Sequence, residues 1–195
     1  MSMAGAKLCI GLTGRMASGK GEAVRILNGY GFHYISLSDI VRGEAARVDP
    51  RVTRSQMQDI GNRLRQEGGA GVLGRMVRER IAAAQEKRWV IDGIRNPAEV
   101  LELKKINDFV LIGIDCDVPT ILARMKRRGR ETDQAAEEEL RAGLEREWGD
   151  GEAAGGQQVG PTLAMADFTI ANNGTIGELQ ARLNEVLNKL GAAHA

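Results

Sequence analysis

Residues Leu8–Ile26 read LCIGLTGRMASGKGEAVRI and decide the fold. An apolar run ends at Thr13, a loop bounded by glycines extends from Gly14 to Gly21, and apolar residues at helical spacing come next. This order predicts a strand, a loop and a helix. The loop has the spacing G-x-x-x-x-G-K, which is typical of a loop that cradles phosphate groups.

Such a loop binds anions through its backbone. Successive N–H groups point at phosphate oxygens, the helix after the loop adds the partial positive charge of its N-terminus, and Lys20 supplies a full charge for the β- and γ-phosphates. Glycines at the two ends allow backbone angles and close approaches that a Cβ atom would block. We therefore predict that the donor phosphates are bound by Gly14, Arg15, Met16, Ala17, Ser18, Gly19, Lys20, Gly21 and Glu22.

Composition narrows the class of protein. With 195 residues the chain is long enough for one domain with a substantial core, and 27 basic against 26 acidic residues give no field that favours nucleic acid or an anionic membrane. No apolar run is long enough to span a membrane, and the first residues do not resemble a signal peptide. Cys9 and Cys116 lie in apolar runs, so we expect reduced core cysteines in a cytoplasmic protein.

Four later apolar runs alternate with helical patterns, which favours a mostly parallel sheet with helices on both faces. The predicted strands are His33–Ser36, Trp89–Ile91, Phe109–Ile114 and Phe168–Ala171.

Capping signals mark three of the helices. Asn96-Pro97 and Asp117-Val118-Pro119 each place a cap before a proline, and Glu99 comes after the first cap at the spacing of a capping box. Thr175 opens a final helix, for which we predict a buried stripe. The members of that stripe are Ile176, Leu179, Leu183, Val186, Leu187 and Leu190.

Two long segments separate these elements. The chain from 39 to 88 is mostly helical in pattern and charged, and it is longer than a simple crossover, so we expect a small subdomain on the substrate side. The glycine-rich stretch Gly149–Pro161 is predicted to be a mobile surface loop.

Asp39 and Arg42 come after the second strand, at the end where open α/β sheets bind ligands. They are candidates for binding the acceptor substrate. The alternative is that Ser38 or Asp39 caps the next helix and that Arg42 lies in solvent.

Asp92 ends the third strand and is followed by glycine, a position from which a carboxylate can organise magnesium near a bound nucleotide. Arg95, just beyond, could bind an acceptor phosphate through its bidentate guanidinium. The alternative is a turn at the strand end with an exposed arginine.

Arg124 and Arg128 lie one turn apart on a basic helix, and positioned arginines stabilise the charge of a phosphoryl group in transfer. A solvated basic face is the alternative. Asn173, after the fifth strand, is either part of a turn or close enough for its backbone to meet an adenine edge.

Together, GLTGRMASGKG, ISLSDIVR, IDGIRNP and ADFTIANNGTIGEL resemble the P-loop nucleoside monophosphate kinase superfamily over nearly the whole chain. The first and last of these look like dephospho-coenzyme A kinase, and the middle ones look like adenylate kinase. With DGIR and the pair Trp148-Gly149, the chain is most similar to an adenylate-kinase-like family often labelled dephospho-coenzyme A kinase-related.

That resemblance implies a three-layer α/β P-loop fold with a five-stranded parallel sheet of order 2-3-1-4-5. It implies a single kinase domain over 1–195, with a helical acceptor-binding subdomain at about 39–88 and a lid at about 124–160. By the same resemblance, Arg42 and Arg95 bind the acceptor phosphate, and Arg124 and Arg128 form the arginine pair at the base of the lid.

The chain departs from these relatives after the P-loop lysine, where Gly21-Glu22 replaces the usual hydroxyl residue. We expect Glu22, or a water held by Asp92, to complete the magnesium shell. The resulting hypothesis is an enzyme that uses ATP and Mg²⁺ to phosphorylate a small molecule, either a nucleotide or dephospho-coenzyme A. The alternative from another class is a regulatory module that binds ATP without transfer.

Overall fold

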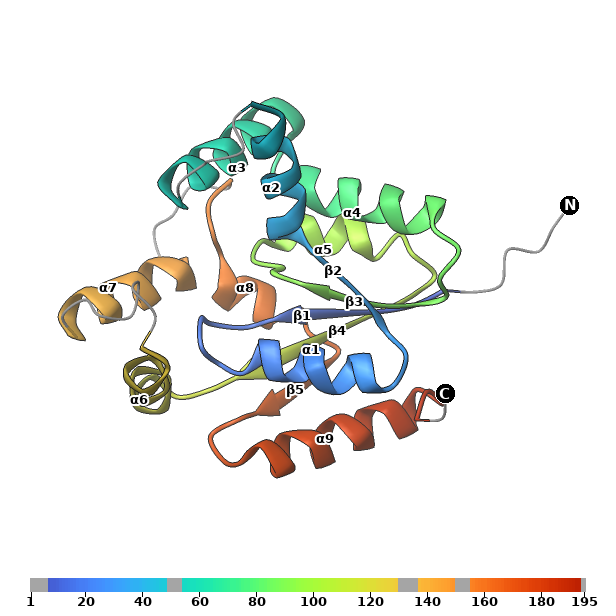
Figure 1. Cartoon of the computed structure of the whole chain (residues 1–195), viewed down its shortest axis with the longest axis vertical. Helices are drawn as coiled ribbons and strands as arrows, with labels where there is room; N and C mark the ends of the chain where they lie inside the picture. Colours follow the sequence, from blue (N-terminus) through green and yellow to red (C-terminus); the bar gives the residue numbers. More distant parts are fainter. Residues whose placement is uncertain (1–6, 49–53, 130–136, 150–154, 194–195) are drawn as a thin grey trace, which may run out of the picture.

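The computed structural model describes residues 7–48, 54–129, 137–149 and 155–193. Its centre is a parallel sheet of five strands in the order β2-β3-β1-β4-β5. This confirms the predicted sheet, strand order and three-layer architecture (Figure 1). The strands are β1 Leu8–Thr13, β2 His33–Ser36, β3 Arg88–Asp92, β4 Asp108–Asp115 and β5 Phe168–Ala171.

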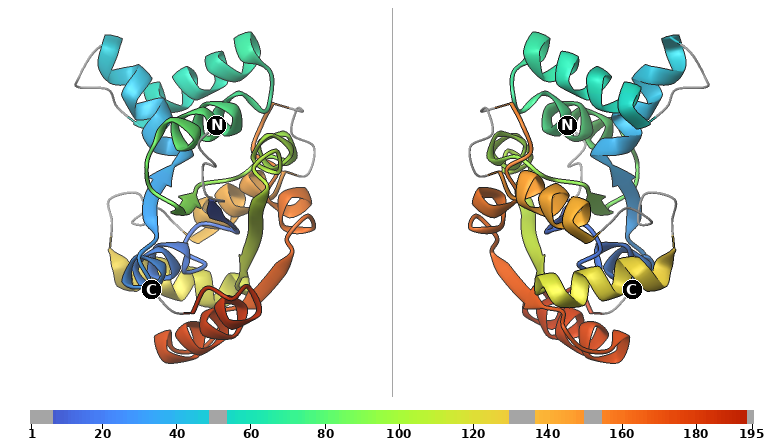
Figure 2. Two further views of the ribbon diagram at one scale, coloured as in Figure 1. Left: turned by 90° about the vertical axis from the view of Figure 1, so that its right-hand side faces the viewer. Right: turned by 90° about the vertical axis from the view of Figure 1, so that its left-hand side faces the viewer.

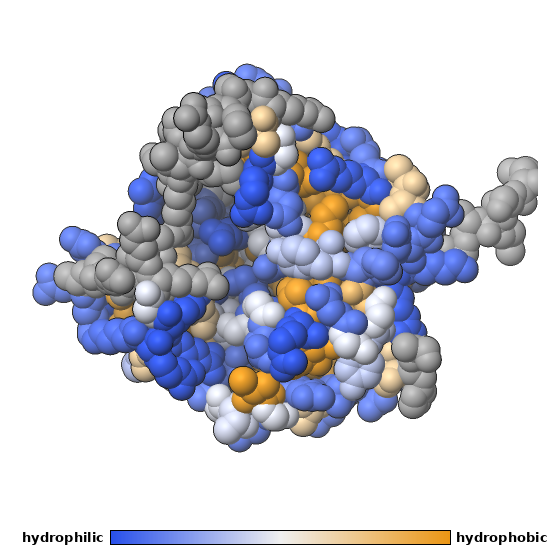
Figure 3. Space-filling view, in the orientation of Figure 1, coloured by the Kyte–Doolittle hydropathy of each residue, from blue (hydrophilic) through white to orange (hydrophobic). Residues whose placement is uncertain are grey.

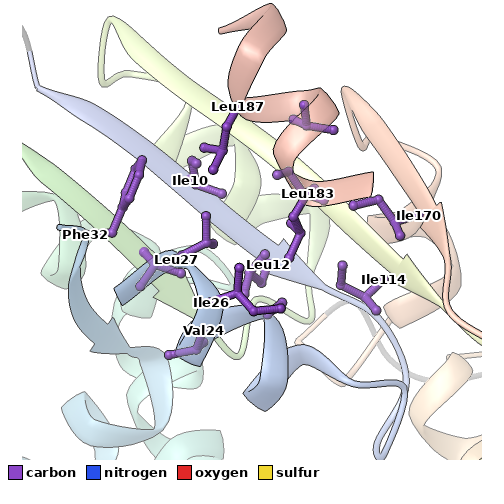
Figure 4. Close-up of a cluster of buried hydrophobic side chains, with 14 of the residues drawn as sticks. Ile10, Leu12, Val24, Ile26, Leu27, Phe32, Ile114, Ile170, Leu183 and Leu187 are labelled. Atoms are coloured by element: carbon purple, nitrogen blue, oxygen red, sulfur yellow. The ribbon is translucent and has the colours of Figure 1, made fainter. Parts of the chain in front are cut away.

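Helices α1 (Lys20–Gly29) and α9 (Ile176–Lys189) cover one face of the sheet. Alternate side chains of a strand point to opposite faces, so Ile10 and Leu12 of β1 point toward these helices. Figure 4 shows Leu183 and Leu187 of α9 meeting the side chains of β1 and α1 in this layer. The N-terminal strand and the C-terminal helix therefore share one core.

Leu183 tests this core. Leu183 is fully buried. The sequence pattern predicted that Ile176 belongs to the same buried stripe, but Ile176 is 56% exposed, so the prediction is wrong for this residue. We expect Leu183→Ala to lower the free energy of unfolding by about 2.5 kcal/mol, because it removes buried apolar atoms and leaves a cavity. Ile176→Ala is the control, and its effect should stay within about 0.5 kcal/mol in urea unfolding. Equal effects of the two substitutions would contradict the packing described.

The other face of the sheet is covered by α4 (Val72–Ala83), α5 (Pro97–Leu103) and α8 (Val159–Leu163). Cys9 and Leu111 point into this layer. At Gly113 of β4, an added Cβ would lie 2.3 Å from Leu163 Cδ1, so α8 packs directly on the sheet. We predicted a surface loop over Gly149–Pro161, and this is wrong for its last residues, because α8 begins at Val159. Residues 150–154 of the predicted loop lie outside the described parts of the chain.

The segment between β2 and β3 is helical, as its pattern predicted. It forms α2 (Leu37–Val48), α3 (Arg54–Gly68) and α4, with a break after Gly68. Helices α2 and α3 lie at the opposite end of the molecule from α9 (Figures 1 and 2). Whether they bind an acceptor stays a prediction.

Three predicted caps are present. The side chains of Asn96, Asp117 and Thr175 accept hydrogen bonds from the first-turn N–H groups of α5, α6 (Val118–Arg128) and α9. Glu99 does not complete a capping box with Asn96, because its carboxylate accepts from the backbone N–H of Arg95 instead.

Helices α6 and α7 (Glu137–Trp148) lie beyond the carboxyl ends of the strands, on the side of the P-loop (Figure 1). Their apolar side chains form a separate small cluster, against which Met16 and Ala17 of the loop pack. This arrangement fixes the site at that end of the sheet.

Both cysteines are buried and free, as predicted, and burial raises the pKa of the Cys9 thiol to about 12. Within the described ranges, every helix is too short or too polar to cross a bilayer. The face in Figure 1 is largely hydrophilic, with apolar residues in separate areas (Figure 3). It therefore offers no single large apolar surface.

Candidate functional site

The loop from Gly14 to Lys20 needs glycine at two positions. Gly14 and Gly19 have φ angles of 138° and 111°, which side chains rarely adopt. An added Cβ would lie 2.2 Å from Ile114 O at Gly14 and 2.1 Å from Asn172 Nδ2 at Gly19. The two glycines thus let the loop lie directly on β4 and on the segment after β5.

Side chains from two other segments hold the loop in place. The carbonyl of Ser18 accepts hydrogen bonds from Asn172 Nδ2 at 2.8 Å and from Arg124 Nη1 at 3.3 Å. Asn173, the predicted contact for adenine, is exposed, and its Oδ1 accepts from the backbone N–H of Asp117 at 3.0 Å. The buried Asn172 was missed by the sequence reasoning. Its position directly after the predicted strand Phe168–Ala171 was the available signal.

Lys20 begins α1 and folds back over the loop. Its Nζ donates to the carbonyls of Gly14 at 2.7 Å and Arg15 at 2.9 Å. Burial lowers the pKa of Lys20, and the negative charge of Asp92 opposes that shift. A desolvated ammonium at this place attracts anions more strongly than it would in water.

Four charged residues form what we name the candidate reaction centre: Lys20 and the three groups whose charges act on it, Asp92, Arg95 and Glu147. Asp92 ends β3 beside Ser36 of β2, and its Oδ1 accepts from the N–H of Gly93 at 2.7 Å. Parallel strands bring their carboxyl ends to one edge, which explains how residues so far apart in sequence meet. Three members of the centre were predicted from sequence, and Glu147 was not.

Glu147 lies at the end of α7, and its side chain is 3% exposed. Its Oε2 accepts from the backbone N–H of Met16 at 2.7 Å, so a carboxylate occupies part of the phosphate-binding loop. The next residue, Trp148, has the guanidinium of Arg15 over its ring at 3.9 Å. A signal existed in the sequence: Glu147 continues the buried face of Leu140 and Leu144 at helical spacing, where an apolar residue would be expected.

Arg95 is held on several sides. Its Nη1 lies 3.5 Å from Glu147 Oε1 and donates to Gln157 Oε1 at 3.2 Å. Its backbone carbonyl accepts from Gln158 N at 2.7 Å, and its backbone N–H donates to Glu99 Oε2 at 2.9 Å. The predicted arginine is therefore positioned by residues that the sequence reasoning did not select.

Glu99 is fully buried and also pairs with Arg65, whose Nη2 lies 3.2 Å from Oε1. Burial raises the pKa of Glu99 above its ordinary value of 4.5, and Arg65 opposes that shift. The pair joins α3 to α5 directly beneath the backbone of Arg95.

The raised pKa predicts a pH dependence. The folded state holds the Glu99 proton more tightly than the unfolded state, so stability falls as the pH rises from the unfolded pKa to the folded one. Glu99→Gln cannot titrate. We therefore expect the stability of the wild type relative to this variant to fall in urea unfolding as the pH rises above 4.5, the ordinary pKa of a glutamate. Parallel curves of stability against pH would contradict this prediction.

Asp39 and Arg42 form an ion pair with each other on the first turns of α2. The capping side chain of α2 is Ser36, which accepts from Asp39 N at 3.0 Å, so neither Ser38 nor Asp39 has the capping role. Burial raises the pKa of Tyr34, a hydrogen bond with Ser36 opposes that shift, and the charges of Asp92 and Asp39 add to it.

The remaining predicted residues have no contact with Lys20, Asp92, Arg95 or Glu147 among those found in the described part of the chain. Arg124 donates to the loop carbonyl of Ser18 and to that of Gly174 at 3.3 Å, and Arg128 is exposed on the last turn of α6. Glu22 pairs with Arg25 at 2.5 Å. Their roles toward phosphate or magnesium stay predictions.

The donor set fits a magnesium ion held jointly with phosphates. Among the described residues there is no group of three or more histidine, cysteine and acidic side chains that could hold a metal. Mg²⁺ at nucleotide sites needs only one or two carboxylates besides phosphate oxygens and water. Asp92, at the strand end near Lys20, could supply that carboxylate.

A hollow of about 290 Å³ adjoins the loop on the side of α6 and α7. Its lining includes Arg15, Val118 and Trp148, but not Lys20, Asp92 or Arg95. The charged residues of the candidate reaction centre therefore lie outside the lining of this hollow.

Comparison with known proteins agrees with this geometry. A family model described as "AAA domain" matches residues 13–141. A "UPF0200 protein" of Methanoculleus marisnigri is 35% identical over 183 residues, covering 93% of this chain and 96% of the relative. Another, from Methanothermobacter thermautotrophicus, is 33% identical over 184 residues, covering 93% and 90%.

Among solved structures, a shikimate kinase from Bacteroides thetaiotaomicron superposes with a TM-score of 0.60 at 14% identity, covering 93% of this chain and 98% of that chain. At this identity the likeness shows a shared kinase-like fold, not a shared substrate.

Proposed function

Because the chain belongs to the UPF0200 family and contains a nucleotide-binding P-loop domain, we propose that it is an ATP-dependent phosphotransferase that moves the γ-phosphoryl group to a nucleotide-like acceptor. The observation that carries the proposal is the convergence of Lys20, Asp92 and Arg95 beside the loop. Binding of ATP alone does not require a further cation beyond the loop, yet Arg95 is held there by Gln157 and Glu147.

Each residue has a distinct role in this proposal. The loop amides and Lys20 bind the donor phosphates, and Arg95, with Asp39 and Arg42, positions the acceptor. Arg124 and Arg128 stabilise the phosphoryl group in transfer. Most of the rate acceleration comes from aligning the two substrates and neutralising charge, because the protein forms no covalent bond to the phosphoryl group during direct transfer.

Magnesium, when bound, neutralises charge on the donor phosphates. Asp92 would hold it, with Glu22 as a second ligand, and the rest of the shell would come from phosphate oxygens and water. The helical segment at 39–88 would form the acceptor side, and the segment at about 124–160 would act as the lid. We place the protein in the cytoplasm, where its two thiols stay reduced.

Dephospho-coenzyme A is the alternative acceptor. One experiment separates it from nucleoside monophosphates and from a regulatory role: the full chain is incubated with γ-labelled ATP and Mg²⁺ and offered each acceptor in turn. Labelled product from one acceptor supports transfer and names the substrate. Tight ATP binding with transfer to none of them would reject the phosphotransferase and favour a regulatory module.

A further inference from the structure

Glu147 is the one buried carboxylate at the candidate reaction centre that the proposed function does not yet use, as far as the described residues go. Its Oε2 is bonded to the N–H of Met16 at 2.7 Å. Its Oε1 is buried and makes no hydrogen bond, and the nearest cation, Arg95 Nη1, is 3.5 Å away. A buried carboxylate oxygen without a donor is costly, so this atom points to a donor that arrives with a ligand.

We propose that Glu147 accepts the proton of the attacking group, and that the phosphoryl acceptor therefore attacks through a hydroxyl and not through a phosphate oxygen. This inference rests on the proposed function and names the class of its acceptor. A hydroxyl is a hydrogen-bond donor, and it satisfies Oε1 in a way that a phosphate oxygen cannot.

The charges around Glu147 also favour an acceptor that attacks through a hydroxyl. A phosphate monoester at this place would bring about two negative charges against a buried carboxylate, and like charges repel strongly where water is excluded. The nearest acceptor-side cation, Arg95, lies 3.5 Å from this carboxylate and donates a hydrogen bond to Gln157. A neutral hydroxyl is not repelled by the carboxylate and does not require a cation to balance its charge.

The chemistry also needs a proton acceptor. A phosphate monoester oxygen is already ionised at neutral pH, whereas a hydroxyl must lose its proton as it attacks, and a positioned carboxylate accelerates such a step about 10²–10⁴-fold. In the proposed step the hydroxyl oxygen forms a bond to the γ-phosphorus. The bond from that phosphorus to the β,γ-bridging oxygen breaks, ADP leaves with the electron pair, and the hydroxyl proton passes to Glu147 Oε1 and then to solvent.

Glu147 is held firmly enough for this role. Its other oxygen is fixed by the P-loop backbone, and the adjacent residue, Trp148, is stacked under Arg15 of the same loop. The donor loop and the proton acceptor are thus connected directly, which keeps Oε1 beside the group to be attacked.

The first test identifies the bond that is formed. The full chain with MgATP is given nucleoside 5′-monophosphates, nucleosides and dephospho-coenzyme A separately, and the products are examined by ³¹P NMR. A new phosphate monoester is the expected product. Formation of a nucleoside diphosphate, which contains a phosphoanhydride, would overturn this inference while leaving the phosphotransferase proposal intact.

The second test uses water as the smallest hydroxyl. Hydrolysis of MgATP without acceptor is compared in the wild type, Glu147→Gln and Glu147→Asp, with Glu139→Gln on the exposed part of α7 as control. Glutamine still accepts from Met16 but does not take up the proton. We expect about 100-fold slower hydrolysis for Glu147→Gln, an ATP dissociation constant within about threefold of the wild type, and partial recovery with aspartate.

An unchanged rate of hydrolysis in Glu147→Gln would reject the role of Glu147. If ATP binding also became tighter in this variant, the carboxylate would only compete with a phosphate for the loop. Thermal unfolding of each variant separates these outcomes from misfolding. A wild type that does not bind ATP would instead reject the proposed function itself.

Discussion

Lys20→Ala is expected to lower the rate of phosphoryl transfer about a thousandfold. The Lys20 ammonium donates to the carbonyls of Gly14 and Arg15, and burial lowers its pKa. Charge that develops on the transferred group would be stabilised by this ammonium in a site with little water. Transfer from labelled ATP in single-turnover reactions is the measurement.

Lys105→Ala is the matched control. Lys105 is exposed and pairs with Glu102, and neither residue has a role in the proposed site, so the substitution removes one cation without touching the loop. Its effect on transfer should stay within about twofold, because exposed ion pairs contribute little. Neither substitution should change the free energy of unfolding by more than about 1 kcal/mol. Equal losses of transfer in the two variants would contradict a specific role for Lys20.

Gly14→Ala is expected to lower the free energy of unfolding by about 3–5 kcal/mol and to abolish ATP binding. The φ of 138° strains any side chain, at about 1–3 kcal/mol, and overpacking adds a similar cost. The added Cβ would lie 2.2 Å from the backbone oxygen of Ile114, which belongs to a central strand and cannot give way easily. Urea unfolding measures the first effect, and titration with ATP measures the second.

The control lies in the same loop. An added Cβ at Gly21 meets nothing within 4 Å, and the residue is in the first turn of α1. Gly21→Ala should leave stability unchanged or raise it by up to about 1 kcal/mol, since alanine favours a helix over glycine. ATP binding should persist, because the Gly21 amide is kept. If Gly14→Ala proved as harmless as Gly21→Ala, the close contact of the loop with β4 would be refuted.

Local patterns were enough to predict the elements of this fold. Each strand is a short apolar run, and β3 and β4 extend only one residue beyond the predicted bounds at each end. The capping residues Asn96, Asp117 and Thr175 act on their own helices, through bonds within three residues. Such signals depend on neighbouring residues, so they are visible in the sequence.

The pattern failed where burial depends on distant contacts. Ile176 has the spacing of the buried stripe, yet it lies in the first turn of α9, at the edge of the packed layer. Val159–Leu163 comes after a glycine-rich stretch, yet it forms a helix whose Leu163 packs against Gly113 of β4. Neither outcome is encoded in the residues next to it.

Some residues of the candidate site were predicted from local patterns, and others were found only in the structure. Lys20 was predicted from the G-x-x-x-x-G-K spacing of the loop, and Asp92 from its place at the carboxyl end of a strand, where open α/β sheets bind ligands. The sequence by itself therefore determined the phosphate loop, its lysine and the strand-end carboxylate. Only the tertiary structure decided that Glu147 and Asn172 complete the site, because their contacts with Met16 and Ser18 cross 131 and 154 residues of chain. A hydrogen bond between such distant residues depends on how the helices and strands pack, which no local pattern specifies.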